Sequence, residues 1–304
     1  GAASLCGRSM SAKYLTTIGY ERLYNPVLQI TDLEKFIKSL TVDMPPAPDH
    51  FSRCSDINRY GPVEVEDLPK LQELNIQQFT EQVQHEGVQV LDSRSYLAYG
   101  SQHIAGAWHL DLNGNFPTFA GWVLPTDKDF LLVADDYHKA VESVVWARRT
   151  GVDRIVGYLD GGMSSWITGG LPTRDVRQIS AEALHDMITG HENFILLDVR
   201  APAEFTENHI EGAVNIPVAD LRTHSGELDK NRLTVLICSS GNRSSLGTSI
   251  LEQNGFTRMM NVAGGMTGYS AAGYTKECRV CANPHGSRYY DNMDIISSNW
   301  TDND

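Results

Sequence analysis

The sequence predicts an α/β protein with two similar domains, each a parallel sheet flanked by helices. The first observation is an internal repeat, in which residues 88–94 recur as 194–200 and residues 103–107 recur as 209–213 at the same spacing. The second is that short apolar runs alternate with helix-like stretches in each copy, which is typical of strands joined by crossover helices. Ligands of such folds bind near the carboxyl ends of the strands.

The expected elements follow the chain in order. Residues 32–40 predict a helix, the proline-rich residues 44–48 predict an extended connector, and residues 58–62 predict a linker before the first copy. A second linker is predicted at 169–172, between the copies. The predicted domains are residues 1–62, a segment outside the repeat with no core of its own, residues 63–172, the first copy, residues 173–275, the second copy, and residues 276–304, a polar tail.

The second copy shows the alternation most clearly. Its apolar residues 194–197 and 233–237 predict strands that are buried on both faces. Residues 244–253 predict a helix, which the following Asn-Gly pair would end. Residues 259–262 predict a further short strand.

The overall composition argues against several classes of function. The chain has 304 residues and a formal net charge of −13, whereas proteins that bind nucleic acid or anionic membranes need a basic surface. No apolar stretch approaches the roughly 20 residues of a membrane span, and no signal segment opens the chain. Five scattered cysteines do not form a disulfide framework, so a reducing cytoplasm is predicted. The opening residues are typical of mid-protein sequence, so we expect residues upstream, with a processed N-terminus as the alternative.

Residues 238–244 have the features of an anion-binding loop. Cys238 lies between the predicted strand and helix, and the positive end of a helix favours thiolate. The small residues that follow allow backbone N–H groups to converge on one point, which the guanidinium of Arg243 would close. Ser244 would cap the helix or bond the thiolate. The predicted nucleophile is Cys238, and the predicted substrate-binding residues are Ser239, Ser240, Gly241, Asn242, Arg243 and Ser244.

The size of this loop bears on its substrate. Cys238 to Arg243 spans six residues counted inclusively, whereas cysteine-dependent phosphatases use a longer Cys-x5-Arg loop that accommodates a tetrahedral phosphate. The shorter loop suits a sulfane sulfur attached to the cysteine. The alternative is a buried, inert cysteine in a glycine turn, because free cysteine is often part of a core.

Both copies resemble rhodanese domains, the fold of sulfurtransferases. The matching landmarks in the second copy are residues 197–200, 204–205, 209–213, 215–217, 238–244 and 264–266. The resemblance implies that Cys238 forms a persulfide within the loop 239–243, and that Arg243 binds the sulfonate of a donor such as thiosulfate. Framework roles, outside the catalytic set, are implied for Asp198, Arg200 and His209.

The first copy departs from this pattern at the loop itself. Ala134 stands at the nucleophile position, and an alanine cannot carry sulfur. Asp135 and Asp136 follow, where they would repel an anionic donor, and Lys139 replaces the arginine without its two-pronged geometry. We therefore predict a non-catalytic rhodanese-like domain. A metal site at Asp135, Asp136 and His138 is the less favoured alternative to solvated acids.

Residues 1–62 resemble a different family, the end of a metallo-β-lactamase-fold persulfide dioxygenase that occurs fused to two rhodanese repeats. The similarity rests on residues 4–8, 17–21, 25–26 and 45–48. It implies that this segment is the C-terminal remnant of such a domain. The His-x-His-x-Asp-His ligands of that family do not occur in the segment, so iron is expected in the absent upstream domain and no cofactor in this chain.

The remaining cysteines do not make a complete site. Cys6 is predicted to be a packed thiol, with a second sulfur carrier as the alternative. Cys54 has no motif around it. Cys278 and Cys281, with His285, have partial zinc spacing but no evident fourth ligand. Free thiols in a flexible tail are favoured there over redox pairing.

The sequence thus predicts a rhodanese-type sulfurtransferase acting on thiosulfate or low-molecular-weight persulfides, with a thiol, cyanide or sulfite as acceptor. A non-catalytic scaffold that docks the upstream dioxygenase domain is the alternative, and the loop length disfavours a phosphatase. The expected partners are small sulfur compounds rather than nucleic acid or membrane, and a homo-oligomer is left open.

Overall fold

The computed structural model describes residues 15–42, 47–114 and 116–275. These residues fall into two compact units that divide between Phe51 and Ser52. Several predictions concern residues outside the described ranges, namely Cys6, Cys278, Cys281, His285, the tail 276–304 and most of the connector 44–48.

The first unit is helical within its described residues. Its elements are α1 (Ile18–Tyr24), η1 (Pro26–Gln29) and α2 (Leu33–Thr41). The helix predicted at 32–40 is confirmed, and Asp32 begins it by accepting a hydrogen bond from the backbone N–H of Lys35 at 2.8 Å. No residue of these three helices is buried, so they form no core of their own.

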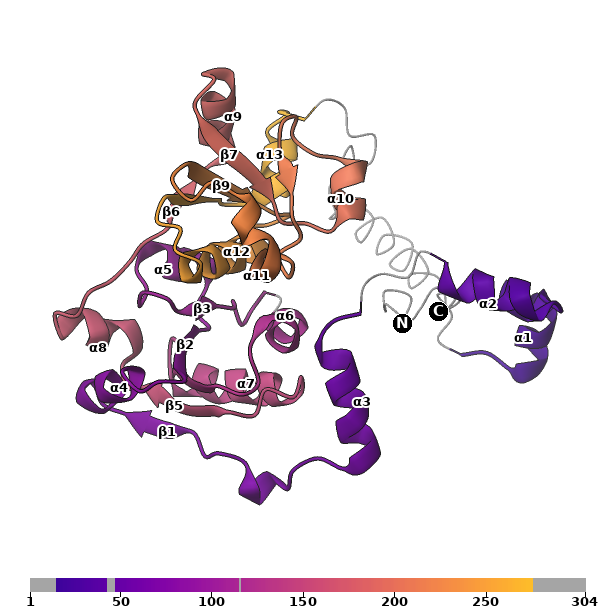
Figure 1. Ribbon diagram of the computed structural model, residues 1–304, viewed down its shortest axis with the longest axis horizontal. Helices are drawn as coiled ribbons and strands as arrows, with labels where there is room; N and C mark the ends of the chain where they lie inside the picture. The colour runs from indigo at the N-terminus through magenta and orange to yellow at the C-terminus, as the bar shows by residue number, and fades with distance from the viewer. Residues whose placement is uncertain (1–14, 43–46, 115, 276–304) are drawn as a thin grey trace, which may run out of the picture. The chain divides into compact units, whose positions relative to one another are not determined.

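The second unit begins in α3 and contains the first repeat. The repeat forms a five-stranded parallel sheet flanked by helices, with strand order β1-β5-β4-β2-β3 (Figure 1). The helix α3 (His50–Tyr60) precedes the repeat. The elements of the repeat are η2 (Val65–Asp67), β1 (Gln72–Leu74), α4 (Ile76–Val83), β2 (Val88–Asp92), α5 (Tyr96–Ser101), β3 (Trp108–His109), α6 (Phe116–Val123), β4 (Asp129–Val133), α7 (Tyr137–Arg148), β5 (Ile155–Leu159) and α8 (Gly162–Thr168). The linker predicted at 58–62 is wrong in part, because α3 continues to Tyr60.

The second repeat has the same architecture, with strand order β6-β10-β9-β7-β8. Its elements are β6 (Arg177–Ile179), α9 (Ala181–Thr189), β7 (Phe194–Asp198), α10 (Pro202–Glu207), β8 (Val214–Asn215), α11 (Leu221–His224), η3 (Ser225–Glu227), β9 (Leu233–Ile237), α12 (Asn242–Gln253), β10 (Met259–Val262) and α13 (Gly265–Ala271). All pairs of neighbouring strands in both sheets are parallel. The predicted α/β class with two parallel sheets is therefore confirmed.

The central strands match the apolar runs from which they were predicted. β7 and β9 are the middle of the second sheet, and all residues of each strand except the first are buried. The helix predicted at 244–253 begins two residues earlier, at Asn242, because Gly241 adopts a left-handed conformation and caps it. Its end at Gln253 agrees with the stop signal.

The two repeats share one core, in which α12 lies between its own sheet and β3 of the first repeat (Figure 1). Leu246, Ile250 and Leu251 of this helix belong to the same buried cluster as Leu91 and Trp108 of the first repeat. Apolar contacts therefore join the copies, which the sequence had suggested only as separate domains.

Polar contacts also join α12 to the first repeat. The backbone N–H of His109 donates to Ser249 Oγ at 3.1 Å, and the His109 ring places Nδ1 2.9 Å from Ser245 Oγ. Burial lowers the pKa of His109 below its ordinary value, against the opposing charge of Asp92. His103 places Nε2 3.0 Å from the carboxylate of Glu252. These pairs give Ser245, Ser249 and Glu252 of α12 hydrogen-bonding partners in the first repeat.

Among the described helices, none is both long enough and apolar enough to cross a lipid bilayer.

Candidate active site

The loop that contains Cys238 joins the carboxyl end of β9 to the start of α12. Cys238 is fully buried, and its sulfur accepts hydrogen bonds from the backbone N–H of Gly241 at 3.1 Å and from the hydroxyl of Ser244 at 3.3 Å. Gly241 reaches this position with a φ of 105°, a conformation that a residue with a β-carbon rarely adopts. The loop therefore presents two donors to the sulfur, both suited to stabilise negative charge there.

The start of α13 holds the other side of the loop. The backbone N–H of Met266 donates to the carbonyl of Cys238 at 2.7 Å, and that of Thr267 donates to the carbonyl of Ser239 at 3.0 Å. Gly265 allows this approach, since a β-carbon at its position would collide with the carbonyl oxygen of Cys238. The residues 264–266, noted in the sequence only as a recurring landmark, thus fix the backbone of the loop.

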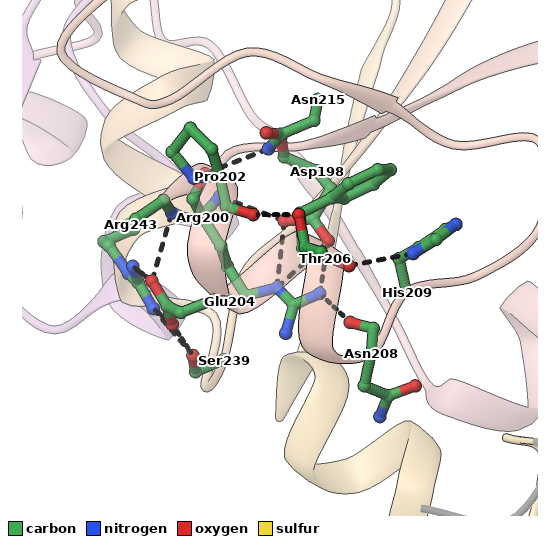
Figure 2. Close-up of polar contacts among 12 residues, drawn as sticks. Asp198, Arg200, Pro202, Glu204, Thr206, Asn208, His209, Asn215, Ser239 and Arg243 are labelled. Atoms are coloured by element: carbon green, nitrogen blue, oxygen red, sulfur yellow. Dashed lines mark hydrogen bonds and ion pairs between the residues drawn. The ribbon is translucent and has the colours of Figure 1, made fainter. Parts of the chain in front are cut away.

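Arg243 points toward α10, where its guanidinium meets Glu204 (Figure 2). Nη1 donates to Glu204 Oε2 at 2.6 Å, and Nη2 donates to Glu204 Oε1 at 2.7 Å and to Ser239 Oγ at 2.6 Å. Burial opposes the charge of Arg243, but the hydrogen bonds and charge of Glu204 outweigh it and raise the pKa of the guanidinium. The sequence identifies Arg243 as part of the loop, but it does not predict this partner.

The ion pair with Arg243 lowers the pKa of Glu204 from the ordinary 4.5 to about 2, chiefly through the hydrogen bonds from the guanidinium. A depressed carboxyl pKa stabilises the folded state above the unfolded pKa, and this contribution is lost as the pH falls through the folded pKa. Because 36% of the Glu204 side chain is exposed, solvent screening limits the contribution to about 1 kcal/mol.

We therefore expect the stability difference between the unmodified protein and Glu204→Gln to be constant near neutral pH and to shrink between pH 4.5 and about 2. Urea unfolding of both proteins along a pH series measures it. A difference that persists unchanged down to about pH 3 would show that the ion pair does not stabilise the fold.

The other predicted loop residues lie in different surroundings. Ser240 is exposed, whereas Ser239 is half-buried and bonded to Arg243. Asn242 is also half-buried, and its side chain lies against Gly114 of the first repeat. The loop thus places only some of its side chains near the sulfur.

The first repeat covers one side of the loop. A β-carbon at Gly241 would lie 3.0 Å from Cε2 of Tyr96, the first residue of α5. The sequence does not predict this contact, because Tyr96 belongs to the other copy and lies outside every motif. The first repeat therefore packs against the loop at Gly241.

A buried ion pair lies at the carboxyl end of β7, close to the candidate site. Arg200 Nη2 lies 2.7 Å from Asp198 Oδ2 and also donates to the carbonyl of Asn208 (Figure 2). His209 is exposed, stacks on Phe205 with ring centroids 4.1 Å apart, and places Nδ1 2.8 Å from the carbonyl of that residue. None of these contacts reaches Cys238, and they order the loop between β7 and β8.

The first repeat repeats this frame but not the site. Ala134 is buried where the second repeat has Cys238, and Asp136 caps α7 by accepting from the backbone N–H of Lys139 at 2.9 Å. Lys139 itself pairs with Glu142 at 2.9 Å. Burial, together with neighbouring carboxylates and against Arg94, raises the pKa of Asp135. Within the described ranges, no three His, Cys, Asp or Glu side chains form a group that could hold a metal ion, so the metal alternative there has no support.

Comparison with known families decides the affiliation of the two repeats. The family model described as "Rhodanese-like domain" matches residues 75–168 and 180–272. The chain belongs to the rhodanese family. The two matched rhodanese segments lie within the copies predicted at 63–172 and 173–275.

Related rhodanese proteins include sulfurtransferases. A sulfurtransferase of Allochromatium vinosum is 32% identical over 32% of this chain and 92% of its own length. The thiosulfate sulfurtransferase PspE of Escherichia coli is 33% identical over 22% of this chain and 67% of its own length. A solved metallo-beta-lactamase from Staphylococcus aureus is 29% identical over 52% of this chain and 43% of that chain, with a TM-score of 0.42. The assignment of residues 1–62 to a metallo-β-lactamase-fold remnant stays a prediction.

Proposed function

We propose that this rhodanese protein is a sulfurtransferase that carries sulfane sulfur as a persulfide on Cys238. The observation that supports this most strongly is the sulfur of Cys238 within hydrogen-bonding distance of Gly241 N–H and the Ser244 hydroxyl. Donors fixed at a site where charge develops stabilise it without reorganisation. Sulfurtransferases among the relatives support the same assignment.

In the first half-reaction, the Cys238 thiolate attacks the outer sulfur of the donor. A bond forms between Cys238 Sγ and that sulfur, while the sulfur–sulfur bond of the donor breaks. Its electron pair leaves on sulfite when the donor is thiosulfate, or on a thiolate when the donor is an organic persulfide. Gly241 and Ser244 would hold the sulfur of Cys238 in position for this attack.

In the second half-reaction, an acceptor thiolate, cyanide or sulfite attacks the outer sulfur of the Cys238 persulfide. The bond between that sulfur and Cys238 Sγ breaks, and its electron pair restores the Cys238 thiolate. The sulfur atom is only moved, so the cycle needs no external oxidant or reductant. We propose that it runs in a reducing compartment such as the cytoplasm, because Cys238 must stay a free thiol, as it is here.

No step of this cycle is assigned to a metal, since the described residues offer no group of metal ligands. We propose that iron chemistry, which the resemblance of residues 1–62 implies, would belong to a dioxygenase domain outside this chain. Such a domain would exchange sulfur with Cys238 through small persulfides.

Intact-mass measurement tests the proposed carrier directly. We expect the protein to gain one sulfur atom after treatment with thiosulfate or an organic persulfide, and to lose it again on addition of cyanide. Peptide mapping should place the sulfur on Cys238 and not on Cys54, the half-buried free thiol of α3. The absence of any gain would favour the non-catalytic scaffold, and Cys238-dependent hydrolysis of p-nitrophenyl phosphate would favour a phosphatase.

A further inference from the structure

Glu204 fills the face of Arg243 that would bind an anionic donor. Its two carboxylate oxygens accept from Nη1 at 2.6 Å and from Nη2 at 2.7 Å. An arginine uses this same two-point geometry to recognise carboxylate and phosphate groups. A sulfonate has a similar set of oxygens, so in this structure its binding position on Arg243 is taken by the protein's own carboxylate.

Further contacts hold Glu204 in this position. Ser239 Oγ donates to Oε1 at 3.1 Å, and the backbone N–H of Ala201 donates to Oε2 at 3.0 Å, which also caps α10. A carboxylate has about four lone-pair sites, and here each oxygen accepts two hydrogen bonds. Moving Glu204 aside to admit another anion would therefore break the ion pair, the contact with Ser239 and the helix cap together.

The charges at this position also cancel. Arg243 and Glu204 carry opposite unit charges, and the low pKa of Glu204, about 2, keeps its carboxylate ionised at neutral pH. Thiosulfate, a dianion, would meet a like charge on Glu204 and gain no free cation from Arg243. An organic persulfide lacks the sulfonate, so the reaction of its outer sulfur with Cys238 Sγ, which Gly241 and Ser244 hold in place, needs no free guanidinium.

We propose that Glu204 is a specificity-determining residue that directs Cys238 toward organic persulfides as sulfur donors and against thiosulfate. This inference rests on the proposed sulfur transfer and names the class of donor for it. Arg243 then acts as a positioning residue, which holds the loop through Ser239, rather than as the group that binds the donor's sulfonate.

The test compares Glu204→Gln with Glu207→Gln. Glutamine keeps the size of Glu204 and can still cap α10, but it removes the charge that neutralises Arg243. Glu207 is the exposed last residue of the same helix, so its variant removes the same charge away from the loop. Second-order rate constants for sulfur loading of Cys238 are measured by intact mass, with thiosulfate and with 2-hydroxyethyl persulfide as donors.

We expect Glu204→Gln to raise the ratio of the thiosulfate constant to the persulfide constant by about 10-fold or more, the value of a charge-assisted hydrogen bond. The ratio for Glu207→Gln should equal that of the unmodified protein. If Glu204→Gln still loads from the persulfide and its ratio is unchanged, the role of Glu204 is refuted while the sulfurtransferase stands. Failure of the unmodified protein to load from either donor would instead overturn the proposed function, and this inference with it.

A second measurement uses the unmodified protein alone. Sulfate resembles the sulfonate end of thiosulfate but carries no transferable sulfur. Because Glu204 occupies Arg243, excess sulfate should not slow loading from 2-hydroxyethyl persulfide more than sodium chloride does at equal ionic strength. Competitive inhibition by sulfate would show that Arg243 is open to anions and would overturn the proposal.

Discussion

Replacing Cys238 by Ser is expected to abolish sulfur transfer, with sulfur loading from 2-hydroxyethyl persulfide, measured by intact mass, falling by on the order of 10³-fold or more. Serine fits the same fully buried position and keeps Gly241 and Ser244 as neighbours. Its hydroxyl, however, does not ionise near neutral pH and cannot form a persulfide. The variant therefore separates the chemistry of the sulfur from the shape of the loop.

Cys54→Ser is the matched control for this experiment. It also removes a free thiol, but from α3 rather than from the loop. We expect it to load one sulfur atom from 2-hydroxyethyl persulfide at the rate of the unmodified protein. Unchanged sulfur loading of Cys238→Ser would show that sulfur transfer uses another residue.

Gly265→Ala should also lower both the stability of the protein and its sulfur loading, although Gly265 takes no part in the chemistry. Its φ of 53° lies in the left-handed region, which costs a residue with a β-carbon about 1–2 kcal/mol. The added carbon would also lie 2.7 Å from the carbonyl carbon of Ser239 and collide with the carbonyl oxygen of Cys238. Relief requires the loop to shift away from α13, at a cost of about 1–3 kcal/mol for overpacking.

Because the shift moves Cys238 itself, we expect the folded variant to lose at least about 10-fold in sulfur loading, since small misplacements of reacting atoms are costly. Gly162→Ala is the control from the first repeat. Gly162 has a φ of 54°, and its β-carbon would lie 2.7 Å from the carbonyl oxygen of Ala134. It should also be destabilised, by a smaller amount because it meets fewer backbone atoms, as measured by urea unfolding, yet keep its activity per folded molecule. Equal loss of activity in both variants would contradict a local effect on the loop.

The sequence predicts the repeated α/β fold because its signals are local. The strand at 233–237 is an uninterrupted apolar run, and an Asn-Gly pair ends the helix at Gln253. The start of that helix at Asn242 was missed because it depends on the left-handed Gly241. The contact between the two copies has no such local pattern, since His109 of the first copy and Ser245 and Ser249 of the second become partners only through packing.

In the candidate site, too, the features that are local in the sequence could be predicted, whereas the contacts between distant segments could not. Cys238 and Arg243 lie in one short segment, so their spacing is visible in the sequence. The direction of the Arg243 side chain is not, because its partner Glu204 is 39 residues earlier and on a different helix. Gly265 was visible only as part of a recurring landmark, and its purpose follows from a backbone contact with Cys238.

Because α12 packs against the first repeat, the second repeat depends on the first for part of its core, even though the proposed chemistry lies in the second repeat alone. The first copy, which has Ala134 in place of the thiol, is then free to vary at the exposed residues 135, 137 and 138, whereas Ala134 is buried and Asp136 caps α7. It is not free to vary at Trp108 or His109, because the side chains of these residues pack against α12 or hydrogen-bond to it. Natural variants of such a protein should therefore differ more often at the exposed residues after Ala134 than at Trp108 and His109 of β3.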